Sequence, residues 1–165
     1  MVMNAVKCRA ICFGFAAVAL LSGCGYEPKG GSVSEIHAGD NLTSFSQEIT
    51  SSIHEFQVKP GGSYTVPISV KNTGTQPWFG GKQATSVDAG YRWIDGKGNV
   101  LPIEGNRAEL DRPSVQPGES DQLKLQVTAP PDPGSYTLWI SMVQEGVAWF
   151  YAQGTKPLVL QVAVK

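Results

Sequence analysis

The chain has 165 residues, and its 13 Lys and Arg against 14 Asp and Glu give a formal net charge of −1. This length suits one domain with its own core, and the near-neutral charge argues against a nucleic-acid-binding protein, which needs a basic surface to displace counterions. Charged residues make up only 16%, while 19 Gly and 11 Pro favour a β-protein with many turns over a helical bundle.

The first 24 residues have the features of an export signal. Lys7 and Arg9 precede an apolar run at residues 10–21. This run is shorter than the roughly 20 residues of a transmembrane helix and is typical of a signal peptide. The residues at its end resemble the bacterial lipobox and are Leu21, Ser22, Gly23 and Cys24. The resemblance implies a lipoprotein signal peptide at residues 1–23, diacylglycerol on the Cys24 thiol, and acylation of the new amino terminus.

The cysteine content agrees with this interpretation. Of the 3 cysteines, Cys8 and Cys12 lie in the signal, so the processed chain keeps Cys24 alone. A disulfide, a CxxC redox motif and a thiolate metal site are therefore not expected. Gly25 stands where an aspartate would retain such a lipoprotein at the inner membrane. We therefore expect a lipid-anchored protein of the bacterial outer membrane that faces the periplasm, since a triacylated cysteine anchors firmly.

Residues 24–48 are predicted to hold the lipidated cysteine and a flexible tether. They are poor in apolar residues and rich in Gly, Ser and Thr. Such a segment has a reach of roughly 25–30 Å. An alternative for its last part is a short helix after Asp40, because Leu42, Phe45, Ile49 and Ile53 follow at helical spacing.

From residue 49 onward, apolar residues recur at every second position. This alternation predicts half-buried antiparallel strands at residues 64–71, 87–94, 122–127, 136–143 and 158–164. Segments rich in Gly, Pro, Asn and Asp favour turns at 59–62, 72–74, 95–99, 116–118, 130–134 and 145–146. About seven or eight short strands within residues 49–165 are typical of an all-β, immunoglobulin-like antiparallel β-sandwich.

Three residues sharpen the prediction of a sandwich. Trp93 points inward on its strand, where such folds place a core tryptophan. Tyr136 follows a Pro-Gly pair at the start of a late strand, as in a tyrosine corner, in which the hydroxyl bonds nearby backbone. Pro67 removes a ladder hydrogen bond, so its strand is expected to be at an edge or bulged there.

Residues 70–78 have the sequence VKNTGTQPW. They resemble the NTG…W signature of the four-tryptophan, immunoglobulin-like domain of NBR1-type autophagy receptors and its bacterial relatives. Residues 91–93, 115–119, 133–136 and 145–150 are similar to a sandwich domain appended to bacterial polysaccharide glycosyltransferases and methyltransferases. The resemblance spans roughly residues 53–165 and implies a noncatalytic accessory or interaction module.

Neither histidine is expected to bind a metal. His37 lies in the predicted tether and His54 at the start of the first strand, and neither has a Cys or His partner at ligand spacing. The segment 95–99 has oxygen-bearing residues but not the ligand spacing of a calcium-binding loop, so a hairpin turn is predicted there.

The acidic residues offer one catalytic possibility. Glu104, Glu109 and Asp111 could supply a carboxylate pair for glycoside hydrolysis, but Arg107 and Arg112 lie among them. A solvated charge cluster is the favoured interpretation. We therefore expect no catalytic residue, no metal and no cofactor beyond the covalent lipid, so the chain is predicted not to be an enzyme.

The aromatic residues are the remaining candidates for function. Trp139 and Arg92 point away from the core-facing residues of their predicted strands, and they share one outer face if the strands are neighbours, as C and F are in this fold. Trp149 and Tyr151 follow the turn at 145–146 and extend this face. A tryptophan beside an arginine can stack a sugar ring or anchor a peptide. The predicted binding face therefore comprises Arg92, Trp139, Trp149 and Tyr151.

The binding face has one alternative: an added strand or the N-terminal segment can cover it instead. Trp78 is not part of the face and is expected to pack at one end of the sandwich. The favoured function is a non-catalytic, membrane-anchored lipoprotein whose sandwich binds an envelope protein or polysaccharide, with no nucleic-acid partner. The rival is a structural subunit of a cell-envelope assembly.

Overall fold

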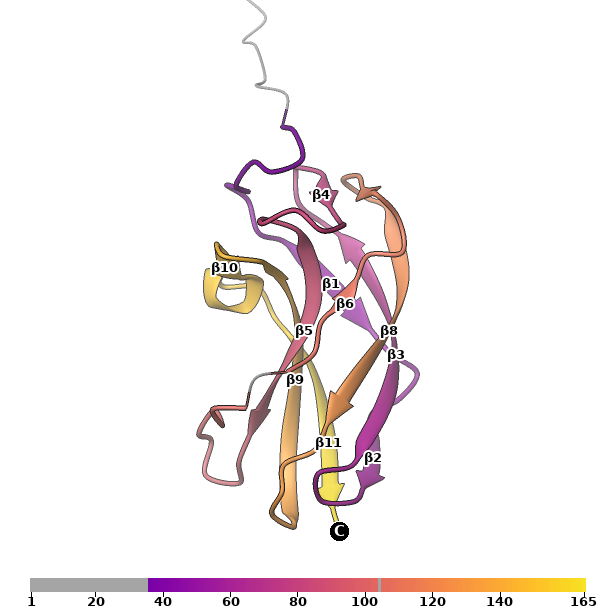
Figure 1. Ribbon diagram of the computed structural model, residues 1–165, viewed down its shortest axis with the longest axis vertical. Coiled ribbons are helices and arrows are strands. Elements are labelled where there is room, and N and C mark those ends of the chain that lie inside the picture. The colour runs from indigo at the N-terminus through magenta and orange to yellow at the C-terminus, as the bar shows by residue number, and fades with distance from the viewer. Residues whose placement is uncertain (1–35, 104) are drawn as a thin grey trace, which may run out of the picture. The chain divides into compact units, whose positions relative to one another are not determined.

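The computed structural model describes residues 36–103 and 105–165 (Figure 1). The predicted signal peptide, Cys24 and the first part of the predicted tether lie outside the described residues. The described residues belong to one compact unit, Ser34–Lys165. Among them there is no helix of the length and apolar character that a membrane span requires.

Two facing sheets form the body of the unit, and all their strand pairs are antiparallel except the parallel pair of β2 and β11. The three-stranded sheet has the order β1 (Gln47–Thr50), β3 (Ser63–Asn72), β8 (Ser120–Thr128). The six-stranded sheet has the order β2 (Glu55–Val58), β11 (Leu158–Val164), β9 (Gly134–Gln144), β5 (Val87–Ile94), β6 (Ala108–Glu109), and β10 (Ala148–Trp149) pairs with β9. A short ribbon joins β4 (Trp78–Phe79) to β7 (Ser114–Val115), and the 3-10 helix η1 (Phe150–Gln153) follows β10. The predicted all-β, immunoglobulin-like sandwich is confirmed.

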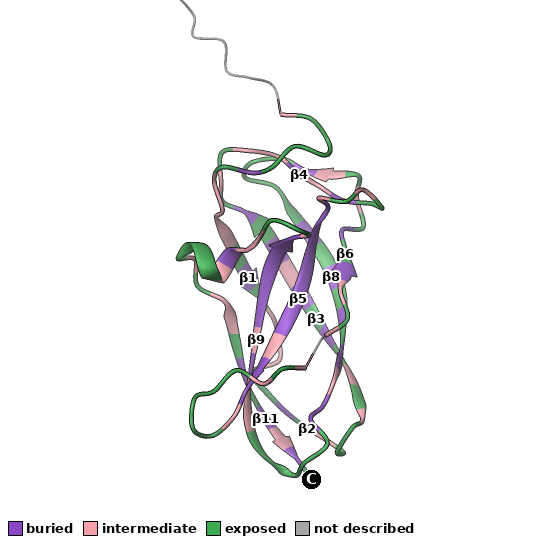
Figure 2. Cartoon of the chain, turned by 60° about the vertical axis from the view of Figure 1, so that its left-hand side comes forward, coloured by how far each residue is buried: buried purple, intermediate pink, exposed green. Residues whose placement is uncertain are grey.

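The core lies between the sheets and comes from the predicted alternation. β3 and β8 alternate buried and exposed residues along their length, as a sheet with one solvated face should. β5 and β9 are different, because most of their residues are buried on both faces (Figure 2). Other segments of the chain therefore cover the outer face of the six-stranded sheet at its centre.

The predicted core tryptophan and tyrosine corner are both present. Trp93 is fully buried, and its indole N–H donates to the carbonyl of Thr128 at 2.9 Å. The Tyr136 hydroxyl donates to the carbonyl of Asp132 at 3.0 Å, four residues upstream. Each aromatic side chain thus fills apolar space while its one polar atom bonds backbone.

Pro67 lies inside β3, yet the absence of its N–H removes no hydrogen bond to β8 or β1. It stands opposite Lys124 of β8, and β1 pairs only with residues from Ser69 onward. Its carbonyl, on the β1 side, accepts from the Ser51 hydroxyl at 2.7 Å. The expectation of a local edge position is therefore correct.

Residues 40–48 belong to the packed body, so the predicted tether ends earlier than residue 48. Leu42 is buried, and its N–H donates to the side chain of Gln144 at 2.9 Å. The same Gln144 amide donates to the carbonyl of Asp40 at 2.8 Å. β1 occupies Gln47–Thr50, so the alternative of a helix across this segment is wrong.

Residues 40–48 pack on the body because β9 has an open edge there, which sequence periodicity does not reveal. β11 pairs with β9 only as far as Ile140, and β10 pairs with Val143 and Gln144, so Ser141 and Met142 have no partner strand on this edge. Gln47 fills this place, because its side-chain oxygen accepts from the Met142 N–H at 2.8 Å and its amide donates to the Lys156 carbonyl at 3.0 Å.

Asn72 organises the turn that carries the NTG motif. It is fully buried, and its amide donates to the carbonyls of Gln76 and Val115 at 2.8 and 2.9 Å. Its side-chain oxygen accepts from the Gly74 N–H at 2.9 Å. The turn places Trp78 at the end of the sandwich, where it is fully buried as expected.

Candidate functional site

The four residues of the predicted binding face lie together. Arg92 and Trp139 are directly opposite each other on the neighbouring strands β5 and β9. The Tyr151 ring lies 5.9 Å from Trp139 and 5.5 Å from Trp149. The Arg92 guanidinium carbon lies 4.6 Å from the centre of the Trp149 ring, within cation–π distance. We call Arg92, Trp139, Trp149 and Tyr151 the outer aromatic face.

A tight turn and a glycine position Trp149. The chain reverses after β9, with Gly146 in the left-handed region at φ 70°, so that Trp149 pairs with Val143. The indole then reaches across β9 to Gly90, where an added Cβ would lie 2.7 Å from its Cη2 atom. Gly90 therefore leaves the space in which the tryptophan packs on the sheet.

Phe150 fixes the neighbouring Tyr151. Phe150 is fully buried, and its ring packs edge-on against Trp78 at 5.5 Å and Phe45 at 5.2 Å. Because the residue before it is anchored inward, Tyr151 at the start of η1 is held on the outer side. Its N–H donates to the hydroxyl of Ser141 on β9 at 3.2 Å.

Arg107 also belongs to this site and was not among the predicted residues. Its guanidinium carbon lies 4.9 Å from the centre of the Trp149 ring. Its Nε donates to Glu145 at 2.5 Å and its Nη1 to the carbonyl of Gly105 at 2.9 Å. The sequence placed Arg107 in a solvated charge cluster, but β6 brings this segment alongside β5, where the side chain is half-buried.

Charge is distributed unevenly over the two arginines. Arg107 is neutralised by Glu145, whereas Arg92 has no carboxylate within 4.0 Å among the described residues. Val159, opposite Trp139 on β11, is 47% exposed. Within the part of the chain that the structure describes, the face thus combines half-exposed tryptophan and tyrosine rings with an arginine that has no ion pair. These three residue types are enriched at the energetic centres of interfaces.

Trp149 and Arg107 cover the centre of the sheet at Gly90. Asp88 and Gly90 point outward from β5, yet both are buried. The expected half-exposure of these positions is therefore wrong. The four residues of the outer aromatic face keep intermediate exposure, so the covering is partial.

Asp88 is an unusual residue under this cover. It is only 4% exposed, its Oδ2 accepts from the Ser86 hydroxyl at 2.8 Å, and its Oδ1 has no partner among the described residues. Removal from water raises the pKa of the Asp88 carboxyl above its ordinary value of 3.8. The Ser86 hydrogen bond partly offsets this rise, and the carboxylates of Glu145 and Glu109 add to it.

Replacing Asp88 by asparagine is expected to raise the free energy of unfolding at neutral pH. Because the folded-state pKa lies above the unfolded-state value, ionisation of Asp88 opposes folding, and this cost disappears as pH falls through the folded-state pKa. The gain in the free energy of unfolding from Asp88→Asn should therefore shrink as pH falls from neutral toward 3.8. Urea unfolding of the wild type and the variant between these pH values measures this gain, with Asp132→Asn, at an exposed aspartate, as control. A loss of stability of the same size at every pH would contradict the prediction.

Of the carboxylates considered for catalysis, Glu104 lies outside the described residues, while Glu109 and Asp111 are exposed and line one groove. Arg112 pairs with Glu119 at 3.4 Å. His37 and His54 are exposed, and residues 36–103 and 105–165 contain no group of three His, Cys, Asp or Glu side chains arranged to hold a metal. The predicted turn at 95–99 is present, with the Asp95 carboxylate accepting from the N–H groups of Lys97 and Asn99.

The strand order and the outer aromatic face define a β-sandwich module with one aromatic, cationic surface. No family model matches the chain, and no curated protein matches it. Similarity is found among solved structures, at low sequence identity.

One such structure is the CARDB domain of a Pyrococcus furiosus protein in complex with di-metal ions, with 17% identity and a TM-score of 0.40 over 80% of this chain and 100% of that one. Another is a β-glucosidase mutant from Listeria innocua in complex with laminaribiose, with 14% identity and a TM-score of 0.44 over 85% of this chain and 20% of the enzyme. A family 123 glycoside hydrolase from Clostridium perfringens has 10% identity and a TM-score of 0.38, and the chain covers 27% of its length. We draw no function from these similarities.

Proposed function

We propose that the protein is a non-catalytic binding module of the bacterial cell envelope, and that the outer aromatic face is its binding surface. The observation that carries this proposal is the convergence of Arg92, Trp139, Trp149 and Tyr151 from three separate segments into one half-exposed cluster. A cluster with only a packing role would be expected to exclude water more completely and to pair its cation.

The ligand in this proposal is an envelope protein or an envelope polysaccharide. Both can use the same groups, since an indole stacks against the apolar face of a sugar ring or against an apolar side chain. An unpaired guanidinium bonds hydroxyl or carboxylate oxygens in either ligand. No cofactor is required beyond the lipid that the proposal places on Cys24.

Tryptophan fluorescence of the unit Ser34–Lys165 tests the proposal. It is titrated with the purified envelope polysaccharide and, separately, with fractionated periplasmic proteins. We expect a saturable emission change that is lost in Trp139→Phe and weakened in Arg92→Gln. Arg112→Gln, a surface arginine near β7, is the matched control and should bind as wild type does.

The failure of both titrations would favour the rival function, a structural subunit locked in an envelope assembly. In that case the chain should leave the membrane in mild detergent as part of a complex of fixed stoichiometry. A substrate turned over by the chain and abolished by a single carboxylate change would contradict both proposals, because each treats the protein as non-catalytic.

The membrane anchor is a separate part of the proposal, supported by the lipobox at residues 21–24. Cys24→Ser removes the thiol that would carry the diacylglycerol, so we expect an unprocessed precursor that accumulates in place of the mature form. Radiolabelled palmitate incorporation and the mass of the mature protein measure this outcome, with Cys12→Ser as control. Normal maturation of the Cys24 variant would refute the anchor, and a mature wild-type protein found in the inner membrane would refute outer-membrane sorting.

A further inference from the structure

β8 is the last strand of the three-stranded sheet, so alternate backbone groups along it face away from β3. Two hydrogen bonds, one at each end of β8, show which of its residues bond β3. The Ala129 N–H donates to the Gly62 carbonyl at 2.8 Å, and the Glu119 carbonyl accepts from the Asn72 N–H at 3.0 Å. Because bonding alternates along an antiparallel strand, the odd-numbered residues bond β3 and the even-numbered residues face the open side.

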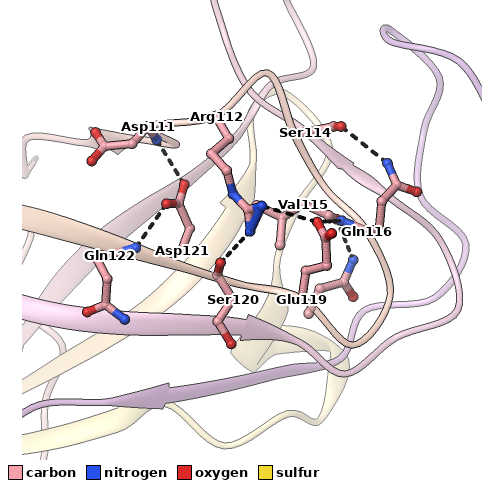
Figure 3. Close-up of polar contacts among 10 residues, drawn as sticks. Asp111, Arg112, Ser114, Val115, Gln116, Glu119, Ser120, Asp121 and Gln122 are labelled. Atoms are coloured by element: carbon pink, nitrogen blue, oxygen red, sulfur yellow. Dashed lines mark hydrogen bonds and ion pairs between the residues drawn. The ribbon is translucent and has the colours of Figure 1, made fainter.

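Side chains close the first end of this open edge. Arg112 donates from Nη2 to the Ser120 carbonyl at 2.5 Å (Figure 3). Asp121 accepts the N–H of Gln122 at 2.9 Å through one oxygen and the N–H of Asp111 at 2.9 Å through the other. The Ser120 carbonyl and the Gln122 N–H at the start of β8 are therefore satisfied within the chain.

Core aromatic residues close the other end. The Thr128 N–H donates to the Tyr91 hydroxyl at 2.9 Å, and the Thr128 carbonyl accepts from the Trp93 indole at 2.9 Å. Between the two closed ends, the Gln122 carbonyl and both backbone groups of Lys124 and Gln126 have no hydrogen-bond partner among residues 36–103 and 105–165. At a strand rise of about 3.3 Å per residue, the open stretch is about 13 Å long.

A groove lies along this open stretch. It has a volume of about 450 Å³ and is lined by Ala108, Glu109 and Asp111 on one side and by Gln122 and Lys124 on the other. β6 is the last strand of the six-stranded sheet on this side, so the groove separates two strand edges. Unpaired donors and acceptors in register at such an edge are a template for a further strand.

The charges along the groove favour a basic occupant. Glu109 and Asp111 are exposed and form no ion pair among the described residues, while Lys124 is the one cation of the lining. A second copy of the chain fits less well. Antiparallel pairing of two β8 strands about Lys124 would place this lysine opposite its own copy, and like charges in that position are destabilising.

We propose that the open stretch of β8 binds an extended peptide with basic side chains, which adds a strand to the three-stranded sheet. Main-chain hydrogen bonds to Lys124 and Gln126 would supply affinity, and the carboxylates of Glu109 and Asp111 would select the charge of the peptide. This surface is distinct from the outer aromatic face, so a result that refutes one proposal does not refute the other.

Fluorescence anisotropy of the full-length chain in mild detergent, with the labelled peptide KVTVKV as probe, tests the proposal. Lys124→Pro removes the groove-facing N–H while keeping the bonds to β3, as Pro67 does on the strand opposite. Lys124→Ala is the matched control, because it removes the same charge but keeps the N–H. We expect Lys124→Pro to weaken binding about five- to tenfold, as loss of one hydrogen bond implies, and Lys124→Ala by no more than about twofold.

Amide hydrogen exchange on the wild-type chain provides a readout that needs no variant. The amides of Lys124 and Gln126 should exchange rapidly in the free chain and slowly with the peptide present. Unprotected amides in the presence of peptide, equal losses in the two Lys124 variants, or equal binding of the acidic peptide EVTVEV would overturn the proposal. If these amides become protected from exchange as the chain concentration rises, without peptide, the proposal would also be overturned, because a second copy of the chain would then occupy the edge.

Discussion

Replacing Asn72 by alanine is expected to lower the free energy of unfolding by about 2–4 kcal/mol. The side chain is fully buried and makes three hydrogen bonds, to Gln76, Val115 and Gly74. Alanine removes the donor to two carbonyls and the acceptor for one N–H in a buried turn. Chemical denaturation of the unit Ser34–Lys165 measures the loss.

Two further variants isolate the cause of this effect. Asn106→Ala changes an exposed asparagine and should leave the free energy of unfolding within about 0.5 kcal/mol of wild type. Asn72→Asp keeps the acceptor for Gly74 but sets a carboxylate against the two carbonyls, so it should destabilise at neutral pH at least as much as alanine does. A neutral effect of either Asn72 variant would mean that the turn is not organised by this amide.

Replacing Gly90 by valine is expected to displace Trp149 and to dismantle the outer aromatic face. The new Cβ alone would lie 2.7 Å from the Trp149 Cη2 atom and 3.2 Å from the Cδ of Arg107. Overpacking of this kind costs about 1–3 kcal/mol. Because Trp149 also packs against Arg92 and Tyr151, ligand binding should be lost while the core between the sheets persists.

Gly96→Val is the matched control for this change. An added Cβ there has its nearest neighbour, the Ser135 carbonyl, at 4.0 Å, so no side chain must move. Near-ultraviolet circular dichroism and thermal unfolding report the two variants. If Gly90→Val leaves the aromatic spectrum and the ligand affinity unchanged, Trp149 does not pack on the sheet at this glycine.

The fold was predictable because each long strand has one face on the core. The period-two pattern of β3 and β8 corresponds directly to their buried and exposed residues. The meeting of Arg92 and Trp139 was also predictable, since it follows from strand alternation once β5 and β9 are neighbours. These inferences use only local periodicity and the usual order of strands in this fold.

The remaining contacts depend on partners that are distant in sequence and have no periodic signal. Arg107 meets Glu145, which is 38 residues away, and Leu42 meets Gln144, which is 102 residues away. The Gln47 side chain takes the place of a strand partner for Met142 between β11 and β10, and the Gln144 side chain does so for the backbone of Asp40 and Leu42. A glutamine that replaces a strand partner resembles any surface glutamine in the sequence, so the length of the tether was overestimated. The double burial of β5 was missed for the same reason, because Trp149 covers it from another strand.

The chain's 4 tryptophans allow one measurement that tests the proposed binding surface most directly. Trp78 and Trp93 are fully buried in the sandwich, whereas Trp139 and Trp149 belong to the outer aromatic face. A ¹H–¹⁵N spectrum resolves each indole N–H, and it is recorded as envelope polysaccharide or periplasmic protein fractions are added. Saturable shifts confined to Trp139 and Trp149 are the predicted result. Shifts at Trp78 or Trp93, or no shift at any indole with either addition, would contradict the assignment of binding to this face.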